Sequence, residues 1–198
     1  LFLCQHHKST PFLVFVGSLY KSKKSVDFFI YPSPDTLLGT VSDKPTVAFF
    51  ASRVVSPAVE EQALRWAEAC CATDRVVISG FQSPLEKSVF ELLLKARHPV
   101  IWALGRALYR RYPHAVEEAL TEQRILIFAV RNARRTGWQT AQTRNYTIAS
   151  MAEESVYAVN EQGRMSSLGV LYGLEVGTKP VRLISLPASC GSVPAGTN

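Results

Sequence analysis

Several familiar catalytic motifs are missing from this chain of 198 residues. It has no GxxxxGK(S/T) phosphate loop, no GxGxxG fingerprint after a strand pattern, and no GxSxG nucleophile elbow. Its four histidines show no metal-ligand spacing with cysteines or carboxylates. These absences argue against a P-loop NTPase, a standard dinucleotide enzyme and an α/β-type serine hydrolase. The sequence indicates no metal and no cofactor, and it favours a binding protein over an enzyme.

Cysteine and long apolar runs are also scarce. The four cysteines contain no CxxC pair, so neither a zinc site nor a disulfide framework is indicated. We expect free thiols in a reducing cytoplasm. The longest apolar runs, such as 11–16 and 46–51, are far shorter than the ~20 residues that a membrane helix needs. We therefore expect neither a membrane span nor a secretory signal.

Positive charge is what the chain has in excess. Hydrophobic residues make up 47% and charged residues 19%, an ordinary globular composition. The formal net charge is +6. An excess of this size suits nucleic acid, anionic lipid or anionic metabolites, although a solvated basic surface without a polyanionic partner would look the same.

From residue 46 onward, strand patterns alternate with helical patterns, which is typical of βαβ units. This alternation predicts an α/β, Rossmann-like fold: a mainly parallel sheet with helices on both faces and right-handed crossovers. The predicted strands are Thr46–Ala51, Arg75–Ser79, Pro99–Leu104, Arg124–Val130, Ser155–Val159 and Pro180–Leu186. The predicted helices are Ala58–Ala72, Pro84–Arg97, Pro113–Glu122, Arg144–Ala152 and Met165–Leu174.

The two ends of the chain differ from this central part. Residues 1–45 contain two strand patterns, Phe12–Val16 and Val26–Tyr31, around a basic linker. They predict an N-terminal extension built as a β-hairpin or as edge strands. Residues 46–186 form the predicted Rossmann-like domain, and residues 187–198 are rich in Ser, Pro and Gly, which predicts a flexible tail.

Four predicted strands end in residues that suit an anionic ligand. Ser52-Arg53, Ser79-Gly80 and Gly105-Arg106 follow the first three, and the loop 131–145 follows the fourth. In a parallel sheet these segments emerge at the carboxyl edge, where ligands of open α/β sheets bind. We expect serine hydroxyls and the free N–H groups of the helix at Pro84 to hold phosphate, and the two glycines can take positive φ and let a ligand backbone come close. Ordinary turn chemistry is the plainer alternative.

Two segments combine arginine with aromatic residues. The first carries Arg131, Arg134, Arg135 and Arg144 with Trp138, and the second carries Arg106, Arg110 and Arg111 with two tyrosines. Arginines track a nucleic-acid backbone and aromatic rings stack on unpaired bases, so the pattern suits single-stranded nucleic acid. A solvated basic loop with its tryptophan packed on the core is the alternative. Glu86, near Ser79-Gly80, is interpreted as a helix-dipole partner or as a base or ribose contact.

The order of these motifs over residues 46–186 resembles the Rossmann-like domain of the DNA-processing protein A (DprA/Smf) family. The sequence motifs of that family come in a fixed order. Gly-Ser-Arg comes first, Ser-Gly-x-x-x-Gly-x-Asp second, and a segment that begins with Gly and ends in Tyr-Pro third. An Arg-Asn-Arg motif at a helix start follows, and a Gly-Ser-rich helix start comes last. Here the corresponding segments are Ala51-Ser52-Arg53, Ser79–Glu86, Gly105–Pro113, Arg144-Asn145-Tyr146 and Ser166-Ser167-Leu168. The departures are Ala51, Pro84, Glu86 and Tyr146, and they imply a diverged site.

The resemblance implies a function in DNA recombination during natural transformation. It implies binding of single-stranded DNA in a basic pocket, transfer of that DNA to a RecA-type recombinase, and a homodimer, without a membrane partner. The residues that we expect to bind nucleic acid or phosphate are Ser52, Arg53, Ser79, Gly80, Gly105, Arg106, Arg131, Arg134, Arg135, Arg144 and Asn145.

Two other functions stay open. A small-nucleotide-binding protein is one, either a sensor or a hydrolase of the lysine-decarboxylase-like (LOG) type. That hydrolase family carries a Pro-Gly-Gly-x-Gly-Thr run, which is absent here and argues against hydrolysis but not against nucleotide binding. The other is a degenerate domain that serves only as an interaction surface.

Overall fold

The structure is a computed structural model of the chain, and it describes residues 37–40, 44–132, 134–160 and 180–185. The strands predicted at 12–16 and 26–31, the helix predicted at 165–174 with its Ser-Ser start, and the tail from 187 lie outside the described residues.

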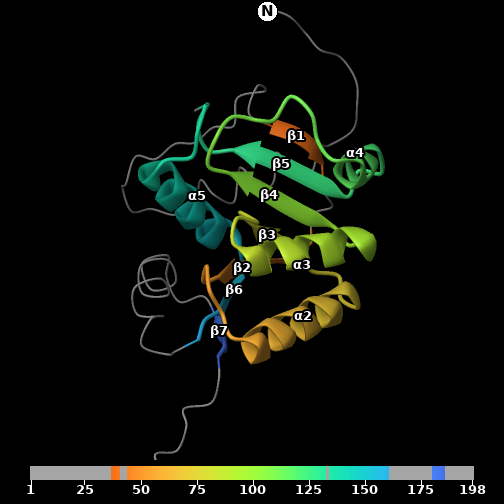
Figure 1. Cartoon of the computed structure of the whole chain (residues 1–198). Helices are drawn as coiled ribbons and strands as arrows, with labels where there is room; N and C mark the ends of the chain where they lie inside the picture. Colours follow the sequence, from red (N-terminus) through yellow and green to blue (C-terminus); the bar gives the residue numbers. More distant parts are fainter. Residues whose placement is uncertain (1–36, 41–43, 133, 161–179, 186–198) are drawn as a thin grey trace, which may run out of the picture.

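One seven-stranded sheet forms the centre of the molecule, in the order β1-β5-β4-β3-β2-β6-β7 (Figure 1). Strands β2 to β7 are parallel to one another, and β1 is antiparallel to β5. The strands are β1 Leu37–Thr40, β2 Thr46–Ala51, β3 Val76–Ser79, β4 Val100–Leu104, β5 Ile125–Ala129, β6 Glu154–Ala158 and β7 Val181–Ile184. The predicted mainly parallel α/β sheet is confirmed.

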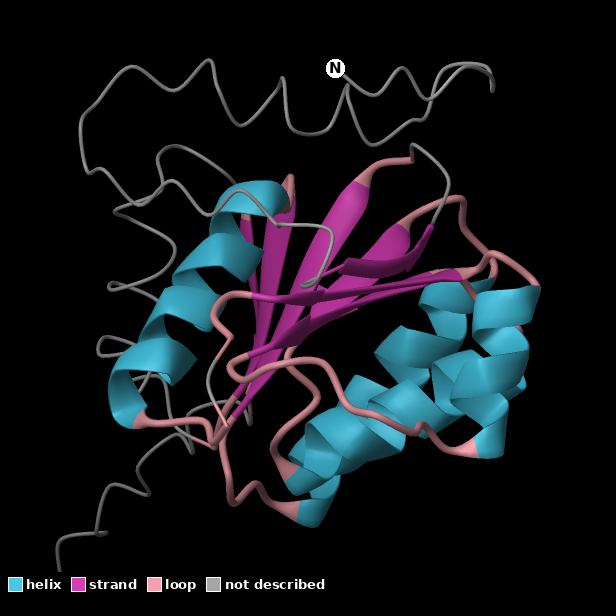
Figure 2. Cartoon of the chain, turned by 90° about the horizontal axis from the view of Figure 1, so that it is seen from above, coloured by secondary structure: helices cyan, strands magenta, loops and turns pink. Residues whose placement is uncertain are grey.

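Helices cover both faces of the sheet (Figures 1 and 2). On one face lie α2 Pro57–Cys71, α3 Pro84–Lys95 and α4 His114–Thr121. On the other lies α5 Trp138–Met151. Each face has its own hydrophobic core, one including Val59, Val89 and Val116, the other including Ile148 and Ala149.

Local sequence explains why α2 and α3 begin where they do. Each has a serine at the N-cap, Ser56 or Ser83, whose hydroxyl oxygen accepts a backbone N–H bond from the first turn. Each also has proline at the first helical position, where its fixed φ suits the helix and its missing N–H costs nothing. These caps place the N-termini of both helices at the carboxyl edge of the sheet.

The N-terminal region contributes an edge strand at a place that the sequence reasoning did not identify. Strand β1 pairs with β5 from Leu37 opposite Phe128 to Thr40 opposite Ile125. Gly39 has φ of 82°, and a Cβ there would lie 2.4 Å from the carbonyl oxygen of Ile125. Only glycine combines this conformation with so close a backbone approach. β1 thereby covers an edge of β5 that would otherwise be unpaired.

Helix α5 begins six residues earlier than the sequence predicted, at Trp138 instead of Arg144. Gly137 is its N-cap, and the Thr140 hydroxyl accepts the Gly137 N–H at 2.8 Å and donates to its carbonyl at 2.9 Å. The prediction failed because the first two turns are mostly polar and expose Trp138, so they show no apolar periodicity. Arg144 and Asn145 therefore lie within a helix, not at its start.

Candidate functional site

The four loops that were expected to meet do emerge at one edge of the sheet. Strands β5, β4, β3 and β2 are consecutive neighbours and parallel, so their carboxyl ends lie side by side. The loops are 52–56, 80–83, 105–113 and 130–137. The sheet order reverses between β2 and β6, which places a topological switch point beside the first loop.

The turn after β3 is closed by its own side chains. The Ser79 hydroxyl accepts the Phe81 N–H at 3.2 Å, and the Gly80 carbonyl accepts the Gln82 amide at 2.9 Å and the Trp102 indole N–H at 3.2 Å. Phe81 has φ of 48°, an unusual value for an aromatic residue. Stacking of its ring on Phe90, with centroids 4.4 Å apart, holds this turn in place.

Glu86 bridges this turn to strand β2. Its buried carboxylate accepts backbone N–H bonds from Gln82 at 2.6 Å, Ala51 at 3.1 Å and Ser83 at 3.2 Å. Burial raises the pKa of Glu86, against the opposing effects of these N–H groups and of the Arg144 charge. The carboxylate takes the place at the α3 N-terminus where we expected phosphate, so a phosphate could use those N–H groups only by displacing Glu86.

The two site glycines act through their size and not through positive φ. Among the described residues, positive φ occurs at Gly39, Phe81, Arg97 and Gln123, so Gly80 and Gly105 do not use the positive φ that glycine allows. A Cβ on Gly80 would lie 2.7 Å from the guanidinium carbon of Arg144. A Cβ on Gly105 would lie 2.8 Å from the Thr136 methyl group. Each glycine therefore allows an element of the β5–α5 segment to approach closely.

Arg144 is a buried charge and not a surface one. Only 7% of it is exposed, and it lies against Gly80 within reach of the charge of Glu86. Its Nε and Nη2 donate to Asn145 Oδ1 at 3.0 and 2.7 Å. A buried guanidinium needs such partners. Arg144 thus connects helix α5 to the end of strand β3 through its contact with Gly80, and Asn145 holds the guanidinium in this position.

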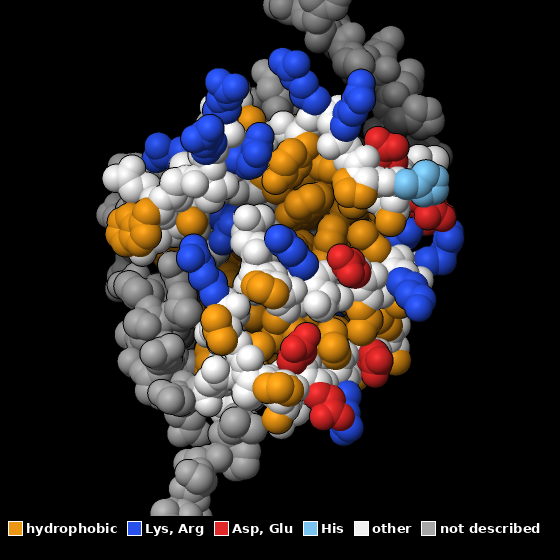
Figure 3. Space-filling model, in the orientation of Figure 1, with side chains coloured by type: hydrophobic (Ala, Val, Ile, Leu, Met, Phe, Trp, Pro, Cys, Tyr) orange, Lys and Arg blue, Asp and Glu red, His pale blue; other side chains and the backbone are white. Residues whose placement is uncertain are grey.

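The loops at this edge carry an excess of positive charge. The four loops contain no Asp or Glu and seven arginines: Arg53, Arg106, Arg110, Arg111, Arg131, Arg134 and Arg135. All but Arg106 are exposed. Figure 3 shows Lys and Arg side chains gathering over the upper left of the molecule. None of these seven arginines takes part in the ion pairs seen within the described ranges, which use Lys44, Arg65, Arg75, Arg97 and Arg124.

Arg106 belongs to an aromatic cluster beside these loops. Its guanidinium carbon lies 4.5 Å from the Tyr109 ring centroid, a cation–π contact. Tyr109 packs in turn against Trp102 and Tyr112, with centroids 5.9 and 5.8 Å apart. The Tyr112 hydroxyl accepts the Tyr109 N–H at 3.1 Å. The second basic-aromatic segment therefore packs partly on itself, while its Arg110 and Arg111 side chains remain exposed.

Asn160 holds the loop after β2, and the sequence reasoning did not identify it. Its Oδ1 accepts the Ser56 N–H at 2.5 Å, and its Nδ2 donates to the Val54 carbonyl at 3.4 Å. The Ser52 N–H donates to the Ala158 carbonyl at 3.0 Å. These bonds tie the loop that carries exposed Arg53 to the end of β6. A single asparagine two residues after a strand gives no signal of this role in the sequence.

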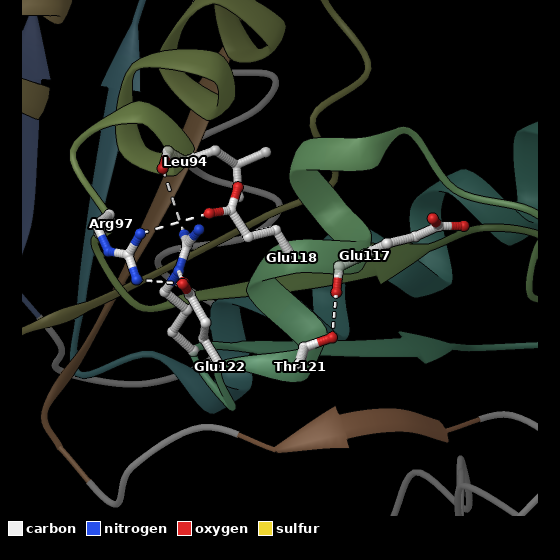
Figure 4. A network of polar contacts seen from close by, with 7 residues as sticks. Leu94, Arg97, Glu117, Glu118, Thr121 and Glu122 are labelled. Carbon is white, nitrogen blue, oxygen red and sulfur yellow. Dashed lines mark hydrogen bonds and ion pairs between the residues drawn. The ribbon is translucent and has the colours of Figure 1, made fainter.

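The opposite edge of the sheet differs in charge. There, a cleft of about 320 Å³ between α3 and α4 is lined by both signs of charge, including Lys95, Arg97, Glu91 and Glu118. Figure 4 shows Arg97 bonded to Glu118 and Glu122. These groups neutralise one another, so this cleft offers no selective attraction to a polyanion.

Neither a membrane helix nor a metal centre is seen in the part of the chain that the structure describes. No described helix is both long and apolar enough to span a bilayer. No group of three or more His, Cys, Asp or Glu side chains lies close enough to hold a metal ion there. Cys70 and Cys71 are free thiols, Cys70 buried and Cys71 half-buried.

Comparison with known proteins supports the fold. No protein-family model matches the chain, and no curated protein does so significantly. DNA processing protein A from Helicobacter pylori, a single-stranded DNA-binding protein, matches with a TM-score of 0.59 at 19% identity, over 85% of this chain and 80% of that one. DprA from Streptococcus pneumoniae matches with a TM-score of 0.58 at 16% identity, over 90% and 68%.

A third similar structure belongs to another class of protein. The molybdenum cofactor binding protein of Rippkaea orientalis matches with a TM-score of 0.50 at 15% identity, over 73% of this chain and 78% of that one. The chain therefore has a Rossmann-like fold of the kind found in DprA proteins, as its motif order predicted.

Proposed function

We propose that this protein binds single-stranded DNA across the carboxyl edge of its sheet. One observation carries the proposal: seven arginines and no acidic residue occupy the four loops at that edge. The fold shared with the single-stranded DNA-binding protein of Helicobacter pylori supports the same conclusion. A DNA strand carries one phosphate per nucleotide, and arginine suits phosphate as a bidentate donor.

The predicted site residues have two different roles in this proposal. Exposed Arg53, Arg131, Arg134 and Arg135 contact the DNA backbone, with Arg110 and Arg111 at the rim. The buried or partly buried residues shape the edge beneath them; they are Ser52, Ser79, Gly80, Gly105, Arg106, Arg144 and Asn145. Removing an exposed arginine should therefore weaken binding without unfolding the protein.

Glu86 restricts which part of the edge can bind the phosphates of the DNA. Its carboxylate already occupies the N–H groups of Gln82 and Ser83 at the start of α3. A second anion there would find these N–H donors already in use. The DNA backbone is therefore expected to follow the exposed arginines of the β2–α2 and β5–α5 loops, and not to enter the turn after β3.

A cellular role in recombination extends the proposal. In a cytoplasmic DNA-uptake pathway, the bound strand would pass to a RecA-type recombinase, and the protein would act as a homodimer. Light scattering of the purified chain tests the dimer. Stimulation of strand pairing by a RecA-type recombinase, with and without this protein, tests the transfer.

A small nucleotide is the rival ligand for the same edge. Its support is that a similar fold occurs in a protein that binds a small molecule, the molybdenum cofactor binding protein, at 15% identity. Thermal unfolding separates the two, since a ligand that binds only the folded state raises Tm by an amount that grows with the logarithm of its concentration relative to Kd. Tm should be measured with an oligothymidylate, with double-stranded DNA of equal length, and with AMP, in parallel samples.

We expect the oligothymidylate to raise Tm at concentrations where AMP has no effect. The variant Arg134→Ala/Arg135→Ala should lose most of this rise. The matched control Arg65→Ala/Lys95→Ala, which removes two exposed charges from the helices α2 and α3, should keep it. A rise with AMP alone would favour the small-nucleotide function, and no rise with any ligand would favour an interaction surface.

A further inference from the structure

The three tryptophans of this chain lie in different environments. Trp66 is partly buried and stacks on Phe49, with ring centroids 4.9 Å apart. Trp102 is partly buried against Phe90 at 5.0 Å, and its indole N–H donates to the Gly80 carbonyl. Trp138 is 74% exposed, and no described ring packs against it. Only Trp138 therefore offers an open ring face.

The surroundings of Trp138 are basic and uncrowded. It is the first residue of α5 and follows exposed Arg134 and Arg135 by only a few residues. The first turn of α5 contains no acidic residue. A Cβ built on Gly137 meets no atom within 4 Å apart from its chain neighbours, so the backbone just before Trp138 is not crowded by other parts of the structure. The ring thus lies beside two exposed arginines, and neither the described loop before it nor the first turn of α5 carries an acidic side chain.

Leaving an indole in water forgoes a large hydrophobic gain, which makes such exposure informative when it occurs in a charged patch. The alternative in the sequence, a tryptophan packed back on the core, does not occur. An occupant of this ring must be flat and apolar on its face and must carry negative charge beside it. A nucleotide of an unpaired strand meets both requirements, because every base has a π-face and a linked phosphate.

We propose that Trp138 is a stacking platform for an unpaired base, next to the phosphate contacts of Arg134 and Arg135. This inference rests on the proposed function and deepens it, since it supplies the feature that distinguishes single strands from duplexes. Arginines attract the backbone of either form. The bases of a duplex are already stacked on one another, so their faces are closed to Trp138.

The test compares a DNA strand with a backbone that has no bases. Fluorescence anisotropy gives Kd for a labelled oligothymidylate and for an abasic oligomer of equal length and charge. The variants are Trp138→Ala and Trp138→Phe. The matched control is Val54→Ala, which truncates another highly exposed apolar side chain, 78% exposed, at the same edge of the sheet.

We expect Trp138→Ala to weaken binding of the oligothymidylate by about tenfold, within the range measured for one base–aromatic stack. Binding of the abasic oligomer should stay unchanged, and Trp138→Phe should restore most of the loss. Binding of the oligothymidylate should quench part of the intrinsic tryptophan fluorescence, and this part should be missing in Trp138→Phe. Val54→Ala should bind both oligomers as the native chain does.

Two results overturn the stacking role while leaving the proposed function in place. One is an unchanged Kd for the oligothymidylate in Trp138→Ala. The other is an equal loss for both oligomers, which would mean that Trp138 serves the fold of the loop. If the native chain binds neither oligomer, the proposed function fails, and the stacking role fails with it. If Trp138 instead contacts a protein partner, Trp138→Ala leaves both DNA affinities unchanged.

Discussion

Replacing Glu86 by alanine should destabilise the folded chain by about 3 kcal/mol. Three backbone N–H groups, of Ala51, Gln82 and Ser83, lose their common acceptor. Gln82 is exposed and can bond to water instead, whereas Ser83 is buried and Ala51 is partly buried. An unsatisfied buried N–H costs about 1–3 kcal/mol, so two of them give roughly 2–6 kcal/mol.

Relief of the buried charge offsets part of that loss. Burial raises the pKa of Glu86, which means that the fold penalises the ionised carboxylate even with its three donors and Arg144 nearby. Glu86→Gln removes this charge and keeps one oxygen acceptor, so its loss should be smaller, about 1 kcal/mol. The stability of the folded chain should therefore decrease in the order native, Glu86→Gln, Glu86→Ala, because of the three hydrogen bonds that the carboxylate accepts.

Urea unfolding followed by circular dichroism measures these differences. For a chain of this length, 3 kcal/mol corresponds to a fall in Tm of roughly 6–12 °C. Glu91→Ala is the control, because Glu91 lies exposed on the same helix and makes no ion pair within the described residues. A Glu86→Ala variant as stable as Glu91→Ala would refute the bridging role of the carboxylate.

Three further predictions concern other buried groups. Burial lowers the pKa of His98 below its ordinary 6.5, so the unfolded chain binds a proton at a higher pH than the folded chain does. Stability should therefore fall as pH drops below about 6.5. In urea titrations, His98→Gln should reduce this dependence of stability on pH. Gly80→Ala must displace the Arg144 guanidinium, so it should lower the stability of the fold by about 1–3 kcal/mol and weaken DNA binding. A variant with the stability and DNA affinity of the native chain would contradict the close contact between Gly80 and Arg144. Burial raises the pKa of Cys70 to about 11, so native Cys70 should resist a thiol reagent that labels it rapidly in urea, as peptide mass spectrometry would show.

The strands and the three helices on one face were predictable because their sequences are locally consistent. The run Thr46–Ala51 is wholly apolar after its threonine, as a strand buried on both faces requires. Pro84 marks a helix start that the structure confirms to the residue, and the helix predicted from Ala58 begins one residue earlier, at Pro57. The start of α5 was not predictable from apolar periodicity, since its first turns are polar and Trp138 faces the solvent.

The loops of the candidate site were predictable, but the roles of several residues in them were not. Ser83-x-x-Glu86 is a capping-box pattern, and it could have indicated that Glu86 binds backbone N–H groups. No local pattern reveals that the same carboxylate also reaches Ala51, which lies 35 residues earlier. The burial of Arg144 likewise depends on the long-range approach of α5 to Gly80, which only the folded chain specifies.

The salt dependence of single-stranded DNA affinity tests the central claim most directly. Each phosphate contact contributes about −0.7 to the slope of log K against log salt concentration for a single strand. Anisotropy titrations over a series of salt concentrations should give a steep slope for the native chain. The slope should fall by about 1.4 in Arg134→Ala/Arg135→Ala and stay unchanged in Arg65→Ala/Lys95→Ala. A flat native slope, or equal slopes in the two double variants, would contradict DNA binding at the carboxyl edge.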